Sequence, residues 1–119
     1  MLKDTEADII RVARECIEIE MKALADLSSQ IQDDFVATVR MIFRSRGRLV
    51  VTGIGKSAIV GQKIVATMNS TGTPSLFMHA ADAIHGDLGM IQPEDVLLCL
   101  SKSVQTPEIK VLIPLVKSR

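Results

Sequence analysis

Residues 50–57 read "VVTGIGKS", an apolar run that leads into two glycines and a Lys-Ser pair. The β-branched run at 49–51 predicts a buried strand, and apolar residues at helical spacing over 57–69 predict a helix. A short loop that joins a strand to a helix N-terminus offers backbone N–H groups to an anion. The stretch therefore predicts an anion site on an α/β fold.

Two nucleotide-binding patterns fit this loop poorly. A Walker A loop needs a glycine five positions before its Gly-Lys pair, where this chain has Val50. Residues 53–58 match the G-x-G-x-x-A pattern of a dinucleotide site, but the next predicted strand ends at His79 with no acid for the ribose. Asp82 follows only after a turn. The loop favours a single small anion over a nucleotide.

The rest of the chain continues the alternation of strands and helices. Residues 75–78 and 96–100 predict further strands, and residues 80–84 predict a helical turn. Thr106 as N-cap, Pro107 and Glu108 then open a last helix. This order predicts an α/β three-layer sandwich around a parallel sheet with right-handed crossovers. With three strands visible, we expect a domain that is truncated or completed by another chain.

The segment before this core predicts a helical pair. Apolar residues recur at spacings of three or four from Ile10 to Ile31, which lines one face of a first helix. Asp33 or Asp34 is expected to cap a second helix, and Gly47 to end it. The predicted organisation is a helical segment over 1–47 and an α/β core over 48–119. The long apolar stripe fits packing on a neighbouring subunit or on the chain's own sheet.

A second polar loop and a histidine segment extend the predicted site. Residues 101–106, "SKSVQT", carry three hydroxyls and a lysine, again before a helix. Ligands of open α/β sheets bind outside the carboxyl ends of the strands, where both loops are expected. Residues 79–90, "HAADAIHGDLGM", hold both histidines of the chain. His85, in a glycine-flanked turn, is a candidate for proton transfer near neutral pH.

Composition narrows the functional classes. Fourteen basic residues balance fourteen acidic ones, and the only aromatic residues are three Phe, which argues against nucleic acid or an anionic membrane surface as partner. No apolar run approaches the ~20 residues that span a bilayer, and no Cys/His cluster has metal-ligand spacing. Cys16 and Cys99 are expected to be buried thiols of a cytoplasmic protein.

The segments "GIGKS", "STGTPS" and "HGDLGM" together resemble the sugar isomerase (SIS) domain of the D-arabinose 5-phosphate isomerases of the KpsF/GutQ type. The resemblance runs from the N-terminal helices to about Leu115. It implies an isomerase that interconverts D-arabinose 5-phosphate and D-ribulose 5-phosphate through an enediol, without a cofactor. In that family the product feeds synthesis of the eight-carbon sugar Kdo for lipopolysaccharide or capsule, and the enzymes form dimers or tetramers.

The resemblance also implies roles for residues of this chain. The expected acid, base and oxyanion-stabilising groups are Lys56, His85 and Glu108. The expected ligands of the substrate phosphate are Ser57, Ser101, Ser103 and Thr106. The backbone at Gly53 and Gly55 is expected to approach the substrate.

Two departures from the family pattern leave an alternative open. Val104 stands where the family has a glycine that permits positive φ, which predicts weaker phosphate binding or a distorted loop. Family members also continue for roughly another half domain, and most carry CBS domains after it. A non-catalytic SIS module that senses a sugar phosphate is therefore the alternative function. A purely structural oligomerisation piece is a third reading.

Overall fold

The computed structural model describes residues 3–84 and 86–102. They divide into two compact units, Met1–Val39 and Arg40–Arg119. The helices and strands, in chain order, are α1 (Glu6–Ser28), α2 (Asp33–Arg44), β1 (Leu49–Gly53), α3 (Lys56–Ser70), β2 (Ser75–His79), α4 (Ala80–Ile84), the 3-10 helix η1 (Asp87–Met90) and β3 (Val96–Leu100).

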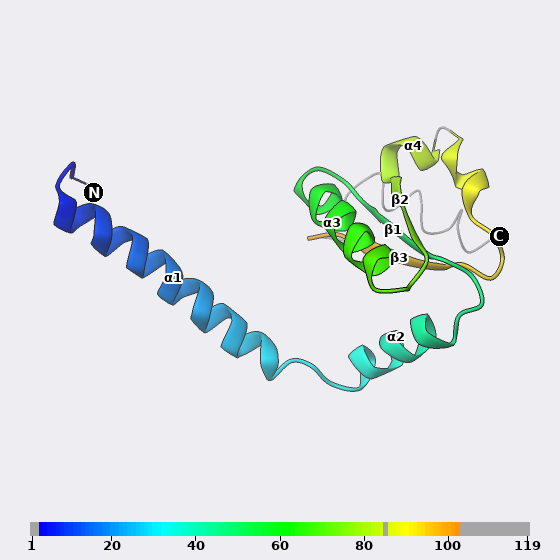
Figure 1. Ribbon diagram of the computed structural model, residues 1–119, viewed down its shortest axis with the longest axis horizontal. Coiled ribbons are helices and arrows are strands. Elements are labelled where there is room, and N and C mark those ends of the chain that lie inside the picture. Colours follow the sequence, from blue (N-terminus) through cyan, green and yellow to red (C-terminus); the bar gives the residue numbers. More distant parts are fainter. Residues whose placement is uncertain (1–2, 85, 103–119) are drawn as a thin grey trace. The chain divides into compact units, whose positions relative to one another are not determined.

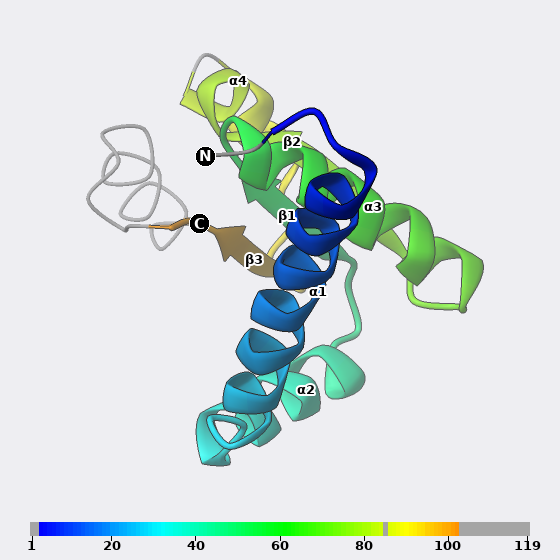
Figure 2. The ribbon, with the colours of Figure 1, turned by 90° about the vertical axis from the view of Figure 1, so that its left-hand side faces the viewer.

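Helix α1 is one uninterrupted helix (Figure 2) that local interactions support. Thr5 caps its N-terminus, where the hydroxyl accepts from the N–H of Asp8 at 3.2 Å. One turn further on, Arg11 is ion-paired with Asp8 and donates to Glu15 at 3.0 Å. None of the residues of α1 is buried.

Helix α2 begins differently from the sequence-based expectation. Asp33 and Asp34 both lie inside its first turn, so neither is the capping residue. The N–H groups of Phe35 and Val36 donate to the carbonyl of Gln32, at 3.1 and 3.2 Å, and the N–H of Phe35 also donates to Asp34 Oδ1 at 2.8 Å. The two carboxylates still suit this end of the helix, because they face the positive end of its dipole.

The sheet has three strands in the order β2-β1-β3, all parallel (Figure 1). Leu49 of β1 is level with Ser75 on one side and Val96 on the other, and Gly53 is level with His79 and Leu100. Every residue of β1 is buried, because the strand has a neighbour on both edges and a layer on both faces. The parallel α/β fold predicted from the sequence is confirmed.

Helix α3 covers one face of the sheet, and glycine lets it come close. A Cβ at Gly61 would lie 3.1 Å from Val51 Cγ1 and 3.0 Å from Phe77 Cε2, so a glycine here allows close packing of helix on sheet. The opposite face carries α4 and η1. The core on that side consists of Val50, Met78, Ala80, Ala83, Leu88 and Ile91.

Gly47 has a different role from the predicted helix end. Helix α2 stops at Arg44, and Gly47 is not among the glycines with positive φ. A Cβ on Gly47 would lie 2.4 Å from the carbonyl oxygen of Glu94. Only a residue without a side chain fits between these two backbones, so Gly47 is a close-packing glycine.

An ion pair between Arg48 and Asp95 joins the chain segments just before β1 and β3. Arg48 donates from its backbone N–H to Asp95 Oδ1 at 2.8 Å and from its guanidinium to Asp95 Oδ2 at 2.9 Å. The same guanidinium donates to the carbonyl of Met90 at 2.7 Å, at the end of η1. Burial by itself raises the pKa of the Asp95 carboxyl, but hydrogen bonds from Arg48 and Gln92 outweigh it and hold that pKa below its usual value.

The expectation of two buried cysteines was wrong for Cys16. Cys16 is exposed because it lies on α1, where nothing is buried. Cys99 is half-buried on β3, and burial raises the pKa of its thiol. The predicted boundary between 1–47 and 48–119 stays a prediction. The helix expected from Thr106 lies outside the described residues.

Candidate functional site

The loop between β1 and α3 depends on two glycines with different requirements. A Cβ at Gly53 would lie 3.1 Å from the carbonyl carbon of Ser57 and 3.2 Å from the carbonyl oxygen of Leu100, so Gly53 lets the first turn of α3 and the end of β3 approach β1. Gly55 has φ of 61° and ψ of −129°, which side chains disfavour, although a Cβ there would meet nothing within 4 Å. Gly53 is therefore required by close packing, and Gly55 is required by its backbone conformation.

Gly55 is also the N-cap of α3, and it leaves that helix end without a side-chain cap. The N–H of Ala58 turns back to the carbonyl of Gly55 at 3.1 Å. A glycine has no side-chain oxygen that could accept from the N–H groups of the first turn. A helix N-terminus with uncapped N–H groups favours a negative charge beside it.

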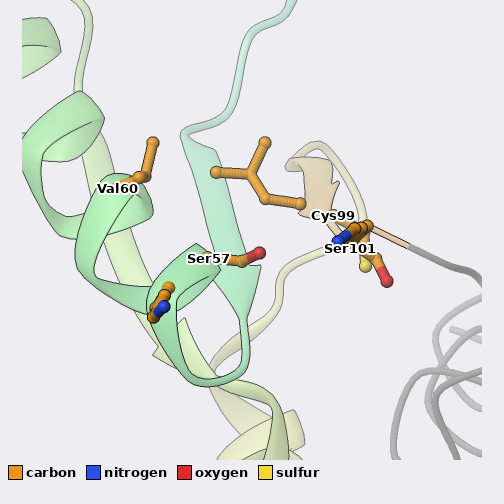
Figure 3. A pocket seen from close by; sticks show the side chains of 7 residues that line it. Ser57, Val60, Cys99 and Ser101 are labelled. Atoms are coloured by element: carbon orange, nitrogen blue, oxygen red, sulfur yellow. The ribbon is translucent and has the colours of Figure 1, made fainter. Parts of the chain in front are cut away.

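A hollow of about 440 Å³ lies beside this helix end. Figure 3 shows Ser57 and Val60 on the α3 side of it and Cys99 and Ser101 on the β3 side. The full lining consists of Lys56, Ser57, Val60, Cys99, Leu100, Ser101 and Lys102. Both predicted loops thus supply residues to one hollow at the carboxyl edge of the sheet.

The chemistry of the hollow suits an anion that also carries hydroxyl groups. Lys56 and Lys102 bring ammonium groups from two separate connections, and Ser57 and Ser101 bring hydroxyls. Val60 and Leu100 give the wall an apolar part. Cations and hydroxyls bind a phosphate, and the apolar surface excludes water from one side of the ligand.

Several predicted site residues meet here, and others lie outside the described residues. Lys56, Ser57 and Ser101 line the hollow, and Gly53 and Gly55 form the loop at its side. The positions of His85, Ser103, Thr106, Glu108 and Val104 lie outside the described residues. Their assignment therefore remains a prediction.

Other residues of the hollow were given no individual role by the sequence. Lys102 was predicted only as the lysine of the second polar loop, and it lies shortly after β3, as Lys56 lies shortly after β1. Val60 and Cys99 read in the sequence only as apolar positions of a helix and a strand. Their contribution depends on which way the elements face at the sheet edge, and one-dimensional patterns do not contain that.

The other histidine of the segment, His79, ends β2 on the far side of β1. Its ring meets Phe77 edge to face, with ring centroids 5.9 Å apart. The register puts it level with Gly53, so it borders the glycine loop on the side away from β3.

Two other kinds of feature are absent from the described part of the chain. Within residues 3–84 and 86–102, no group of three or more His, Cys, Asp or Glu side chains is placed to hold a metal ion. Over the same residues, no helix has both the length and the hydropathy required to cross a membrane.

Comparison with known proteins decides the family. Residues 41–119, which include the sheet, the glycine loop and the hollow, match the SIS domain. The chain belongs to the SIS domain family. This agrees with the resemblance seen in the sequence.

Several curated relatives with similar sequences are named arabinose 5-phosphate isomerase KdsD. The chain is 50% identical over 110 residues to the Pseudomonas aeruginosa protein of that name and 43% identical over 110 residues to the one from Escherichia coli K12. Each alignment covers 92% of this chain but 34% of the relative. The chain thus spans about a third of the length of these curated relatives.

A solved structure extends the likeness to three dimensions. The SIS fold of this chain matches the protein c3406 of Escherichia coli CFT073, solved in complex with arabinose 5-phosphate, with a TM-score of 0.90 and 35% identity. The match covers 96% of this chain and 61% of that one. The arrangement of elements described above is therefore one in which a related protein has been seen with that sugar phosphate.

Proposed function

We propose that this chain supplies the sugar-phosphate-binding part of an aldose–ketose isomerase that interconverts D-arabinose 5-phosphate and D-ribulose 5-phosphate. The observation that carries the proposal is the hollow at the carboxyl edge of the sheet. It combines Lys56, Lys102 and two serine hydroxyls beside an uncapped helix N-terminus. The likeness to a protein solved in complex with arabinose 5-phosphate, and to relatives named as isomerases of that sugar, supports this ligand class.

The proposed binding follows from the charges of the site. A phosphomonoester carries close to two negative charges at neutral pH, and the α3 N-terminus together with hydroxyl donors compensates them. Ser57 and Ser101 lie on opposite sides of the hollow and are the proposed phosphate ligands within the described chain. Ser103 and Thr106 complete the set that the family resemblance implies.

The proposed reaction moves one proton between neighbouring carbons. A base takes the proton from C2 of the open-chain aldose, and the electron pair forms the C1–C2 double bond of an enediolate. A proton then returns to C1, while the C2 oxygen becomes the ketone and its proton passes to O1. The step needs one acid/base group and a stabilised oxyanion, and it oxidises and reduces carbons of the same molecule without an external redox partner.

Three residues are proposed for these tasks. Lys56, at the edge of the hollow, supplies a cation for the enediolate oxygen. His85 and Glu108 are proposed as proton-transfer groups from the family pattern alone. In the cell, we place the reaction in the cytoplasm, ahead of Kdo synthesis for lipopolysaccharide or capsule.

The test is a proton NMR time course of the chain with D-arabinose 5-phosphate in D2O. The proposal expects ribulose 5-phosphate to appear with deuterium at C1, and expects Lys56→Met to lower the rate at least tenfold. Lys63→Met is the matched control, because Lys63 is an exposed lysine of the same helix outside the hollow. Equal loss in both variants would contradict the assignment of Lys56.

The sensor alternative predicts a different pattern in the same experiment. Substrate signals would broaden on binding, Ser57→Ala would abolish the broadening, and no deuterium would enter the sugar. Val104→Gly is a second test. The added backbone freedom of the loop should tighten phosphate binding for an enzyme and for a sensor alike, so the readout that separates them is turnover. Turnover appearing only with Val104→Gly would favour an enzyme with an impaired phosphate loop over a sensor.

A further inference from the structure

The hollow beside the α3 N-terminus has two lysines and no acidic side chain in its lining. Lys56 is the first residue of α3, and Lys102 lies two residues beyond the end of β3. In the part of the chain that the structure describes, every ion pair involves Arg11 or Arg48, and neither lysine takes part in one. Within that part, no carboxylate is paired with either ammonium group of the hollow.

One of these cations occupies an electrostatically unfavourable position. The N-terminus of a helix carries a partial positive charge, so acidic residues suit its first turn and basic residues destabilise it. Helix α3 has no acidic residue in its first turn, has no side-chain cap, and begins with Lys56. A bound anion would remove this conflict, and a second ammonium group in the same hollow increases the positive potential that attracts an anion.

An open-chain sugar phosphate presents negative charge at two separate places. Its phosphate is on C5, whereas the charge of the enediolate develops on the oxygens of C1 and C2. The phosphomonoester alone carries about 1.5 to 2 negative charges at neutral pH. One ammonium group cannot contact both ends of such a ligand, so two cations on separate connections suit it better than one.

The surroundings of Lys56 suit the reacting end of the sugar. Val60 lies four residues further along α3, so it shares a side of the helix with Lys56, and both line the hollow. An apolar neighbour keeps water away from part of the ligand, which strengthens the attraction between the ammonium group and a charge that develops there. Ser57 is turned by about 100° from Lys56 around the helix, so a phosphate bound by Ser57 need not contact Lys56.

The surroundings of Lys102 suit the phosphate. Lys102 directly follows Ser101, which lines the hollow across from Ser57 (Figure 3). Lysine brings a full charge and three N–H donors on a flexible stem, and phosphate oxygens accept from several donors at once. Because Gly53 of β1 is level with Leu100 of β3, the connections that follow the two strands start next to each other. Ligand groups held by the two connections can therefore belong to one small molecule.

We propose that Lys102 determines the affinity of the hollow for the phosphate of the substrate, and that Lys56 serves the sugar end. This division rests on the function proposed above, because it distributes the two ends of that substrate between the two lysines. Lys102 contacts a charge that is present throughout the reaction, so it contributes equally to the substrate complex and to the transition state. Lys56 acts on a charge that exists only after the proton has left C2. The two lysines should therefore affect different kinetic constants.

Binding of inorganic phosphate to the full chain tests Lys102 without any turnover. In a phosphorus NMR titration at low salt, Lys102→Met should raise the dissociation constant about tenfold, because a charge-assisted hydrogen bond is lost. Lys102→Arg keeps the charge and should stay within about threefold of the unchanged chain. Lys56→Met should change the constant by about twofold or less. Lys63→Met is the matched control, because Lys63 is an exposed residue of α3 outside the hollow.

The kinetic constants of the isomerase are the second test. With D-arabinose 5-phosphate, Lys102→Met should raise KM about tenfold and leave kcat within about twofold, whereas Lys56→Met should lower kcat. Lys102→Arg should restore KM. A merely structural role of Lys102 would not produce this pattern, because partial unfolding lowers kcat by reducing the amount of active enzyme. Circular dichroism of each variant establishes that the fold is retained.

Three results would overturn the proposal. Phosphate affinity that is the same in Lys102→Met, in Lys63→Met and in the unchanged chain, or undetectable in all three, would show that Lys102 does not bind the phosphate. A loss in Lys56→Met as large as that in Lys102→Met would show that the two lysines do not divide the ligand. A fall in kcat without a rise in KM for Lys102→Met would place this lysine at the reacting end.

These failures are distinguishable from a failure of the proposed function. A chain that isomerises the sugar but binds phosphate without Lys102 has the proposed function and lacks the proposed division. A chain that binds phosphate through Lys102 but incorporates no deuterium from D2O into the sugar has the phosphate site without the isomerase activity.

Discussion

Strand β1 and helix α1 are opposites in how they are stabilised. All five residues of β1 are buried, whereas none of the 23 residues of α1 is. The strand is held by burial and by backbone hydrogen bonds to two neighbours. The helix is held by a threonine cap and a chain of three charged side chains.

This difference separates a region that packs a core of its own from one that is stabilised by local interactions. The sheet unit buries its core between α3 on one face and α4 with η1 on the other, and it positions the hollow without help. Helix α1 has formed its local interactions but contains no buried residue. The two regions should therefore respond differently to the same change.

The largest effect is expected from one charge placed in each region. Val51→Asp would bury a carboxylate without a partner in a fully buried strand, which costs about 4 kcal/mol or more and should unfold the sheet unit. Ile19→Asp on α1 places the same carboxylate at a side chain that is 69% exposed, so protection of the sheet unit should not change.

Hydrogen exchange read by mass spectrometry measures both responses separately. The strand segments should lose protection in Val51→Asp and keep it in Ile19→Asp. Equal loss of strand protection in the two variants would mean that the folding of α1 and of the sheet is coupled, and that the two regions are not stabilised independently.

A smaller but still large effect is expected from one methyl group. Gly47→Ala puts a Cβ against the Glu94 carbonyl, 2.4 Å away in the present backbone, so the connection before β1 must shift. We expect about 2–3 kcal/mol lower free energy of unfolding. Gly89→Ala is the control, because a Cβ there meets nothing within 4 Å and its φ is not positive. Urea unfolding of the two variants gives the difference, and equal midpoints would refute the close-packing role.

Acid should distinguish two carboxylates whose pKa values are both lowered. Hydrogen bonds from Lys3 and Arg11 lower the pKa of Asp8 on α1; burial raises that of Asp95, but bonds from Arg48 and Gln92 outweigh it. A carboxyl whose pKa is lower in the folded state than the unfolded-state pKa of about 3.9 stabilises the fold at pH values above about 3.9. This stabilisation is lost as the pH falls through the folded-state pKa. For Asp95, whose side chain is 2% exposed, this loss should appear in the unfolding of the sheet unit below about pH 4.

Substitution isolates the Asp95 contribution. Asp95→Asn should lower the free energy of unfolding by about 2–3 kcal/mol at pH 7, because both carboxylate oxygens accept hydrogen bonds and the amide nitrogen that replaces one of them is a donor. The variant should also flatten the dependence of stability on pH below about pH 4. Asp8→Asn should leave the sheet unit unchanged at both pH values. An unchanged acid slope in Asp95→Asn would show that other carboxylates determine it.

The sequence predicted the strands well, but it predicted the packing and exposure of individual residues less well. The runs at 49–51, 75–78 and 96–100 predicted all three described strands, because a buried parallel strand needs a continuous apolar stretch. Gly47 and Cys16 were misread. A glycine that ends a helix and one that admits a neighbouring carbonyl look alike in one dimension, and so do a buried and an exposed cysteine.

The candidate site shows the same limit. Lys56, Ser57 and Ser101 were predicted, since polar residues after parallel strands meet at one sheet edge. Val60 and Cys99 were not, because an apolar side chain lines a hollow only when its element faces that way. The 3-10 helix η1 was missed as well, since four residues are too short for a periodic signal.

The smallest effect is expected at a single buried hydroxyl of β1. Thr52 is fully buried, and among the described residues its Oγ1 has no hydrogen-bond partner. Thr52→Val keeps the shape and removes an unpaired polar group, so the free energy of unfolding should rise by about 1 kcal/mol. Thr52→Ser keeps the hydroxyl and loses a buried methyl, so it should lower that free energy by about 1 kcal/mol. Thr67→Val, at an exposed position of α3, is the control and should change little. A less stable Thr52→Val variant would mean that the hydroxyl is paired in the folded protein, and β1 would then be held by a polar contact as well as by burial.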